Sequence, residues 1–179
     1  MKKTIIMLLC ATSLLFVGCK DKQEKELSDK APKGVEKVDL GLPSGLKWAS
    51  MNVGATTPEG YGDYFSWGEI KSKKIYNWNT YKWCKKSYDK ITKYCCISDD
   101  YGTIDNKAIL DKEDDAAYIN WGGDWRTPTE AEQRELMTHC SWIWTNDFNS
   151  TGIKGYIVKS KTNENFIFLP AAGFRLEAD

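Results

Sequence analysis

The chain has 179 residues, of which 41% are hydrophobic, and this size and composition suit one globular domain with short appendages. Its 25 basic and 25 acidic residues give a formal net charge of zero. That balance argues against a nucleic-acid partner, because such a partner requires a clustered basic surface. Eight tryptophans, nine tyrosines and six phenylalanines favour either a loop-rich fold with large anchors or a surface that stacks on ligands, and composition does not separate the two.

The N-terminus has the features of a bacterial targeting signal, predicted over residues 1–18. Two lysines precede a short apolar run that is too brief to span a membrane. The run ends in Phe16-Val17-Gly18-Cys19, which resembles the lipobox of bacterial lipoproteins. The resemblance implies that cleavage exposes Cys19 and that its acyl chains anchor the protein in a membrane. Lys20 at the next position favours the outer membrane by the same resemblance. An ordinary secretory signal with an incidental cysteine is the alternative.

Residues 19–34 are predicted to form the lipidated cysteine and a flexible charged tether. The segment is rich in lysine and acidic residues and poor in apolar ones. It cannot bury enough apolar surface to offset the entropy lost on ordering. The alternative interpretation is a signal that directs the lipoprotein to the cell surface.

The globular domain is predicted over residues 35–179 and begins with a β-hairpin. Residues 35–40 and 46–53 have strand composition, and the turn residues Pro43 and Gly45 stand between them. Further strands are expected at 64–69, at 142–144, and in a second hairpin formed by 153–160 and 166–169.

Two helices are predicted, and the second has a well-marked start. Thr129 and Glu132 have the spacing of a capping box, in which each side chain binds the backbone N–H of the other residue. The apolar face of this helix is expected to carry Gln133, Leu136, Met137 and Cys140.

The first helix is predicted over residues 106–119 and carries an acidic cluster that includes Asp111, Glu113, Asp114 and Asp115. The cluster invites interpretation as a calcium site, but its order does not fit the calcium loop with its fixed glycine and terminal glutamate. A solvated helix face is the preferred interpretation, and no metal site is predicted.

Several motifs along residues 35–175 occur in an order typical of one family. They are Val38-Asp-Leu-Gly-Leu-Pro-Ser-Gly-Leu-Lys-Trp48, Asn52-Val-Gly-Ala-Thr56, Tyr61-Gly-Asp-Tyr-Phe-Ser-Trp-Gly-Glu69, Asp115-Ala-Ala117, Trp121-Gly-Gly123, Trp125-Arg126, Pro128-Thr129 and Phe168-Leu-Pro-Ala-Ala-Gly-Phe-Arg175. Together they resemble the Fibrobacter succinogenes major paralogous domain, which is abundant in surface lipoproteins of Bacteroides-type bacteria.

This resemblance implies an α+β, C-type-lectin-like domain with two helices and a twisted, mostly antiparallel sheet. It implies no established chemistry. Members of the family continue past the segment that matches residues 168–175, so the resemblance implies a domain that is incomplete at its C-terminus. A missing continuation would leave the strand at 166–169 at an exposed sheet edge.

Residues 71–105, called the insertion below, are rich in aromatic residues and lysine and carry three of the domain's four cysteines. These four are Cys84, Cys95, Cys96 and Cys140. An exported protein meets an oxidising compartment, and Cys84–Cys95 is the preferred pair among the possible disulfides. The spacing does not resemble a zinc site, and a single histidine weakens that interpretation further.

No catalytic arrangement stands out in the sequence, so the protein is predicted not to be an enzyme and to need no cofactor. The only histidine, His139, adjoins Cys140, but neighbouring residues on a helix point in directions about 100° apart and do not readily form a nucleophile–base pair.

The preferred function is a binding module at the cell surface that recognises a glycan or a protein. Its candidate ligand-binding residues are Tyr76, Trp78, Tyr81 and Trp83, because aromatic rings stack on the C–H faces of sugars. Ordinary packing is the alternative role for each of them. The alternative functions are a structural or fimbria-like component without a small ligand, and a truncated paralogue without function.

Overall fold

The computed structural model describes residues 27–176. The expected targeting signal and Cys19 therefore lie outside the described residues. Within the described range the chain forms a mixed α+β structure, with two α-helices and two small antiparallel sheets, which confirms the predicted structural class. No helix in this part of the chain has the length and apolar character needed to cross a membrane.

The predicted first hairpin is present, although both strands are shorter than expected. Strand β1 (Lys37–Asp39) pairs antiparallel with β2 (Lys47–Ala49). The turn residue Gly45 adopts a positive φ of 71°, and its N–H donates to the carbonyl of Leu42 at 2.8 Å. Leu42 itself is buried, so the loop contributes to the core as well as reversing the chain.

The second sheet contains three strands in the order β3–β4–β5, all antiparallel. These are β3 (Cys140–Thr145), β4 (Gly155–Ser160) and β5 (Phe166–Pro170). The strand and the second hairpin predicted for this region are confirmed. Among the described strands β5 pairs only with β4, which places β5 at a sheet edge, as expected.

Helix α2 (Glu130–His139) begins with the predicted capping box. The N–H of Glu132 donates to the Thr129 hydroxyl at 3.3 Å, and the N–H of Thr129 donates to the Glu132 carboxylate at 2.7 Å. Leu136 is fully buried against the sheet, but Met137 is 64% exposed. The prediction that Gln133 and Met137 belong to the buried face is therefore wrong, because both are exposed and α2 presents only a narrow stripe to the core.

The main core lies between α2, the first hairpin and the second sheet. Its buried members are Leu40, Leu42, Leu136, Cys140, Val158 and Ile167. Polar contacts reinforce the same junction, since the Ser160 hydroxyl donates to the Leu40 carbonyl at 2.7 Å. The short first hairpin is thereby fixed to the larger sheet.

Helix α1 (Ala116–Trp121) is much shorter than the helix predicted over residues 106–119. Its start is set by Asp115, whose carboxylate accepts from the N–H groups of Ala117 and Tyr118 at 2.8 and 3.2 Å. A capping aspartate lies outside the helix it caps, so the residues before Asp115 belong to another element. They form a short 3-10 turn, η2 (Lys112–Asp114).

The predicted solvated acidic face is also wrong in part. Asp114 and Asp115 are both buried, with 1% and 5% of their surface exposed. Glu113, which lies next to them in the sequence, is exposed as expected.

The end of the predicted tether contacts the domain. The N–H of Leu27 donates to the Tyr118 hydroxyl at 3.1 Å, and the Leu27 carbonyl accepts from the N–H of Gly123 at 2.7 Å. Gly122 has φ +69°, and a Cβ atom there would lie 2.0 Å from the Ser28 carbonyl oxygen. Gly122 and Gly123 therefore form a turn that allows the entering chain to approach the end of α1 closely.

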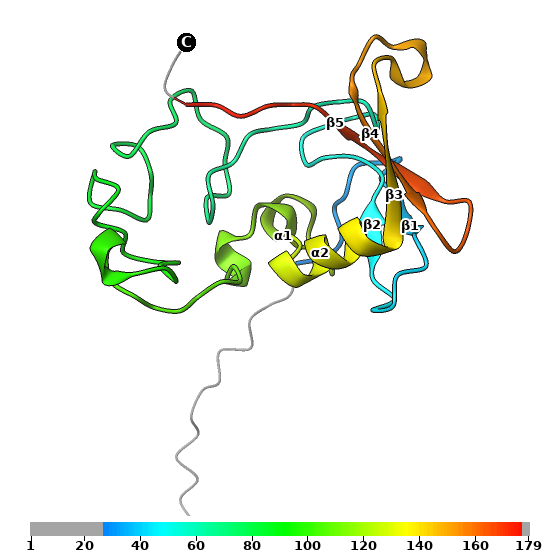
Figure 1. Ribbon diagram of the computed structural model, residues 1–179. Helices are drawn as coiled ribbons and strands as arrows, with labels where there is room; N and C mark the ends of the chain where they lie inside the picture. Colours follow the sequence, from blue (N-terminus) through cyan, green and yellow to red (C-terminus); the bar gives the residue numbers. More distant parts are fainter. Residues whose placement is uncertain (1–26, 177–179) are drawn as a thin grey trace, which may run out of the picture.

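Figure 1 shows the insertion, drawn in green, at the end of the molecule opposite to the β3–β5 sheet, with α1 and α2 between them. The segment that follows β5 runs back from the sheet toward the insertion. The Tyr64 hydroxyl donates to the Ala172 carbonyl along this path, and Arg175 lies 4.6 Å from the centre of the Tyr64 ring. The two ends of the molecule are thus joined by the C-terminal segment as well as by the helices.

Candidate functional site

The insertion is an ordered loop region with very little regular structure. It contains one short 3-10 turn, η1 (Asp99–Tyr101), and isolated bridges through Ile91. The Ile91 N–H donates to the Tyr101 carbonyl, and the Thr92 N–H donates to the Trp83 carbonyl, both at 2.8 Å. Loops longer than about 15 residues without secondary structure are uncommon in compact domains and are usually functional or disordered. This insertion is longer than twice that limit.

Asp114 fixes the insertion to the rest of the domain. Its carboxylate accepts from the Lys82 ammonium at 2.9 Å, the Lys93 ammonium at 2.5 Å and the Tyr94 hydroxyl at 2.8 Å. Burial alone raises the pKa of Asp114, but the hydrogen bonds from Lys93 and Lys82 outweigh it and hold the pKa below its usual value. Two lysines thus compensate one buried carboxylate.

Three carboxylates in this region, those of Asp111, Glu113 and Asp114, have oxygen atoms within 4.8 Å of one another. Asp111 also pairs with Lys93 and Lys107, each at 2.6 Å. Since ammonium groups already contact two of the three carboxylates, the cluster has a structural role in the described chain, and we assign no metal to it.

Two of the four predicted ligand-binding residues make structural contacts within the protein. Tyr76 is buried, and its hydroxyl donates to the Tyr64 carbonyl at 2.6 Å and accepts from the Lys73 N–H at 2.9 Å. The indole N–H of Trp83 donates to the Gly68 carbonyl at 2.8 Å. Two ammonium groups lie 4.1 and 4.7 Å from the centre of the Trp83 ring; they belong to Lys82 and Lys93.

The other two predicted residues, Trp78 and Tyr81, form an edge-to-face pair with ring centres 6.0 Å apart. Trp78 is 46% exposed. The Tyr81 hydroxyl donates to the Trp67 carbonyl at 3.0 Å, which joins the pair to a third aromatic residue. Burial first, and then the nearby charge of Glu69, raises the pKa of Tyr81 to about 12, so this hydroxyl stays protonated as a donor.

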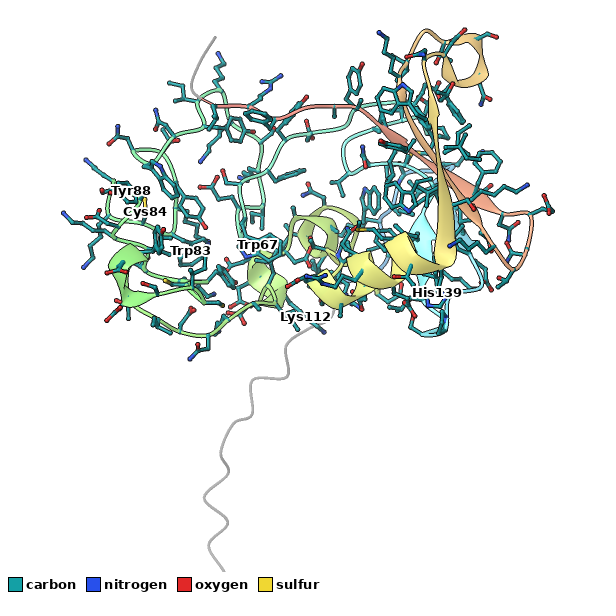
Figure 2. The ribbon with its side chains drawn as sticks, viewed as in Figure 1. Trp67, Trp83, Cys84, Tyr88, Lys112 and His139 are labelled. Carbon is teal, nitrogen blue, oxygen red and sulfur yellow. The ribbon has the colours of Figure 1, made fainter. Side chains whose placement is uncertain are left out.

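Trp67 is 44% exposed and completes a set that we call the aromatic surface: Trp67, Trp78 and Tyr81. Figure 2 places Trp67 between the insertion and α1. The predicted strand at 64–69 is not formed. Instead, the Glu69 N–H donates to the Ser66 carbonyl at 2.9 Å, and Gly68 has φ +74°. The four candidates named from the sequence do not include Trp67, whose stretch was expected to form a strand, although the glycine after this tryptophan is typical of a turn.

A groove of about 490 Å³ runs from Trp67 toward the helices. Its apolar lining includes Trp48, Met51, Ala117, Trp121 and Trp125, and its polar lining includes Glu69, Asp124, Arg126, Glu132 and Gln133. Small-molecule sites typically have volumes of about 300 to 1,000 Å³ and combine a mainly apolar lining with a few polar groups. Trp67 lines the groove, and its backbone carbonyl accepts from Tyr81, so the groove and the aromatic surface meet at this residue.

The carboxylates that line the groove are paired. Glu69 contacts the Lys73 ammonium at 2.6 Å, Asp124 contacts the Lys37 ammonium, and Glu132 contacts the Arg126 guanidinium at 2.5 Å. The hydrogen bond from Arg126 is the main reason that the pKa of Glu132 falls to about 2.

One buried side-chain donor among the described residues that line the groove has no partner. Trp125 is buried, and its indole N–H has no acceptor among the described residues. Its ring packs edge-to-face against Trp121 at 5.1 Å, which fixes it in the wall of the groove. Buried donors without an acceptor are rare in folded proteins and call for an explanation.

The expected disulfide is not formed in the structure, where all four described cysteines are free thiols. The Cys84 thiol donates to the Trp78 carbonyl at 3.0 Å, and the Cys95 thiol lies 3.5 Å from the Ser98 carbonyl. Burial raises the pKa of the Cys140 thiol. Figure 2 shows His139 at the C-terminal end of α2, far from Trp67 and Trp83.

Comparison of the chain with protein-family models, with curated proteins and with solved structures found no match.

Proposed function

We propose that the protein is a non-enzymatic binding module of the bacterial cell envelope that recognises a glycan through the aromatic surface. In this proposal Cys19 carries the lipid that anchors the chain in the outer membrane, and the domain is a C-type-lectin-like member of the family that the sequence motifs resemble. The observation that carries the proposal is the exposure of Trp67 and Trp78 on loops that are held in place by buried contacts.

Exposed tryptophans suit a glycan because their flat rings stack on the C–H faces of sugar rings while nearby polar groups bind hydroxyls. Tyr81 links Trp67 and Trp78, because its hydroxyl donates to the Trp67 carbonyl and its ring packs edge-to-face against Trp78. The loop next to Trp78 carries polar groups: the Asn77 side-chain oxygen accepts from the Thr80 N–H at 3.2 Å, and the Lys73 ammonium donates to the Thr80 carbonyl at 2.9 Å. The surface thus combines apolar rings with hydrogen-bonding groups.

The anchoring of the insertion supports the proposal because a binding surface is most effective when it is ordered before the ligand arrives. Asp114 holds Lys82 and Lys93 from inside the domain. Glu69 also accepts from the Lys82 N–H at 2.7 Å. The two buried carboxylates thus hold Lys82, which precedes Trp83, and Lys93 further along the insertion, so little order remains to be gained on binding.

A structural role without a small ligand is the second candidate, and one observation favours it. Trp144 and Tyr156 on the β3–β5 sheet are 46% and 41% exposed, and their ring centres lie 5.0 Å apart. Exposed aromatic residues on a small sheet with open edges also suit contact with another protein.

The proposal is tested by binding of the full chain to a panel of immobilised oligosaccharides, in a detergent without a sugar headgroup. We expect retention of the wild-type protein and loss of retention for Trp67→Ala. Tyr88→Ala is the matched control, because Tyr88 is an exposed aromatic residue of the insertion that packs on Tyr101 instead. Near-UV circular dichroism with a cooperative thermal transition establishes that each variant is folded. Retention of no oligosaccharide, or equal loss for both variants, contradicts the proposal.

A further inference from the structure

The groove beside Trp67 offers a second and more selective contact for the same ligand. We infer that the groove receives the end of a neutral oligosaccharide chain, whose following sugar rings lie on the aromatic surface. This inference rests on the proposed function and adds to it the charge of the ligand, its direction and a separate set of residues.

The pairing of the groove's charges argues for a neutral ligand. Its three carboxylates already contact Lys37, Lys73 and Arg126. A charged sugar would have to compete with these ion pairs and would leave one partner of a pair without its counter-charge. A neutral sugar leaves all three pairs intact and needs only hydrogen bonds and apolar contact.

The lining of the groove argues for a ligand with both apolar faces and hydroxyl groups. Trp48, Met51 and Trp121 provide apolar walls. Trp125 adds a wall whose indole N–H has no acceptor among the described residues and which is more than nine-tenths buried. This N–H is not accessible in the unbound structure, so a sugar hydroxyl or ring oxygen in the groove supplies the missing acceptor once the indole ring turns toward it.

The direction of the ligand follows from Trp67, which is shared by the groove and the aromatic surface. A chain that is bound by both must pass over Trp67. At about 490 Å³ the groove has the size of a small-molecule site, which suits the end of a chain more than the middle of a long polymer.

The first test compares two tryptophan substitutions on the exposed surface of α2. Gln133→Trp places a large side chain at the groove, whereas Met137→Trp adds the same side chain one turn further along, at an exposed position that does not line the groove. We expect Gln133→Trp to weaken binding of a neutral oligosaccharide by at least tenfold and Met137→Trp to leave it within twofold. Oligosaccharides that carry a carboxylate or sulfate at the terminal sugar are expected to bind at least tenfold more weakly than neutral ones.

The second test observes the indole N–H groups by NMR in the full chain. Trp125 and Trp142 are the two described residues with a buried, unpartnered indole N–H, and only Trp125 lines the groove. We expect a neutral oligosaccharide to shift the Trp125 signal and to leave that of Trp142 in place. The signals are assigned with Trp125→Phe and Trp142→Phe.

The outcomes separate this inference from the proposed function. Suppose that Trp67→Ala abolishes binding, that Gln133→Trp leaves the affinity unchanged and that the Trp125 signal does not shift. The aromatic surface then binds glycans, and the groove inference is wrong. Preference for charged oligosaccharides also overturns the inference but leaves the proposed function standing. If no oligosaccharide binds, both are wrong.

Discussion

Asp114 and Asp115 are adjacent in the sequence, but their buried carboxylates fix two different parts of the protein. Asp114 accepts from Lys82, Lys93 and Tyr94 of the insertion. Asp115 caps α1 and also accepts from the N–H and hydroxyl of Thr127, at 2.8 and 3.0 Å, in the segment that leads to α2. This pair of residues therefore connects the insertion to both helices.

Asp114→Asn is expected to destabilise the domain by about 3 kcal/mol, because it leaves two ammonium groups without their shared carboxylate and one of them, on Lys93, is largely buried. Urea unfolding measures the change, and limited proteolysis shows whether cleavage moves into residues 71–105.

Glu113→Gln is the matched control for Asp114, since Glu113 is the exposed neighbour. It is expected to change stability by less than about 0.5 kcal/mol. Equal stability of the two variants would show that Asp114 does not anchor the insertion.

The Glu132–Arg126 pair predicts a specific loss of stability in acid. The folded-state pKa of Glu132 is about 2, against 4.5 for the isolated side chain. A lowered pKa means that the stabilisation is fully present above about pH 4.5 and is lost as the pH falls toward 2. It amounts to roughly 3 kcal/mol. Glu132→Gln is therefore expected to be destabilising at pH 7 and nearly neutral at pH 2, as measured by urea unfolding at both values.

Glu130→Gln provides the comparison on the same helix turn. Glu130 pairs with Arg134 at 2.6 Å, but both side chains are more than 70% exposed. Surface pairs of this kind contribute little, so the stability of this variant is expected to follow that of the wild type at both pH values. The account of the Glu132 pair fails if the two variants have the same pH dependence.

Gly122→Ala is expected to release the N-terminal segment from the domain. An added Cβ meets the Ser28 carbonyl oxygen at 2.0 Å, so the segment must move. Hydrogen exchange at the Gly123 amide, which donates to the Leu27 carbonyl, is expected to rise by at least tenfold.

Gly152→Ala is the comparison at a glycine that has a positive φ but no close contact. Gly152 has a similar positive φ of 74°, but no atom lies within 4 Å of its added Cβ. Gly152→Ala tests a positive φ at a position without a close contact, whereas Gly122→Ala adds both the clash and a ψ of −158°, a combination that essentially only glycine adopts. Unchanged exchange at Gly123 in the Gly122 variant would show that the segment is not held at this turn.

Leu136→Ala is expected to cost about 2 to 5 kcal/mol, because Leu136 is fully buried between α2 and the second sheet. Met137→Ala at the next position is expected to cost less than about 1 kcal/mol, because that side chain is mostly exposed. Thermal unfolding of both variants checks the two values. A large loss of stability for Met137→Ala would contradict the orientation of α2, which buries Leu136 and exposes Met137.

The features predicted correctly from the sequence are those that depend on local chemistry. The capping box at Thr129 and Glu132 involves residues three apart, and the first hairpin depends on turn residues such as Gly45. The mixed α+β class follows from such elements.

The features that were missed depend on distant parts of the chain. Asp114 looks like a solvent-exposed residue in the sequence, and its burial becomes favourable only because Lys82 and Lys93 reach it from the insertion. In the same way, Tyr76 looks like a ligand-binding residue until its hydroxyl is seen to bind the Tyr64 carbonyl. The groove is formed by four separate stretches of sequence, and no local pattern indicates it.

The central claim is that the exposed tryptophans of the aromatic surface, and not exposed tryptophans in general, bind a glycan. Trp78 and Trp144 test it most directly, because each is 46% exposed and they lie on the insertion and on β3 respectively. Isothermal titration of the full chain with the best-retained oligosaccharide of the panel is the measurement. We expect Trp78→Ala to weaken binding about tenfold, or about 1.4 kcal/mol, and Trp144→Ala to leave it unchanged. Unchanged affinity for Trp78→Ala, or a greater loss for Trp144→Ala, would contradict the account.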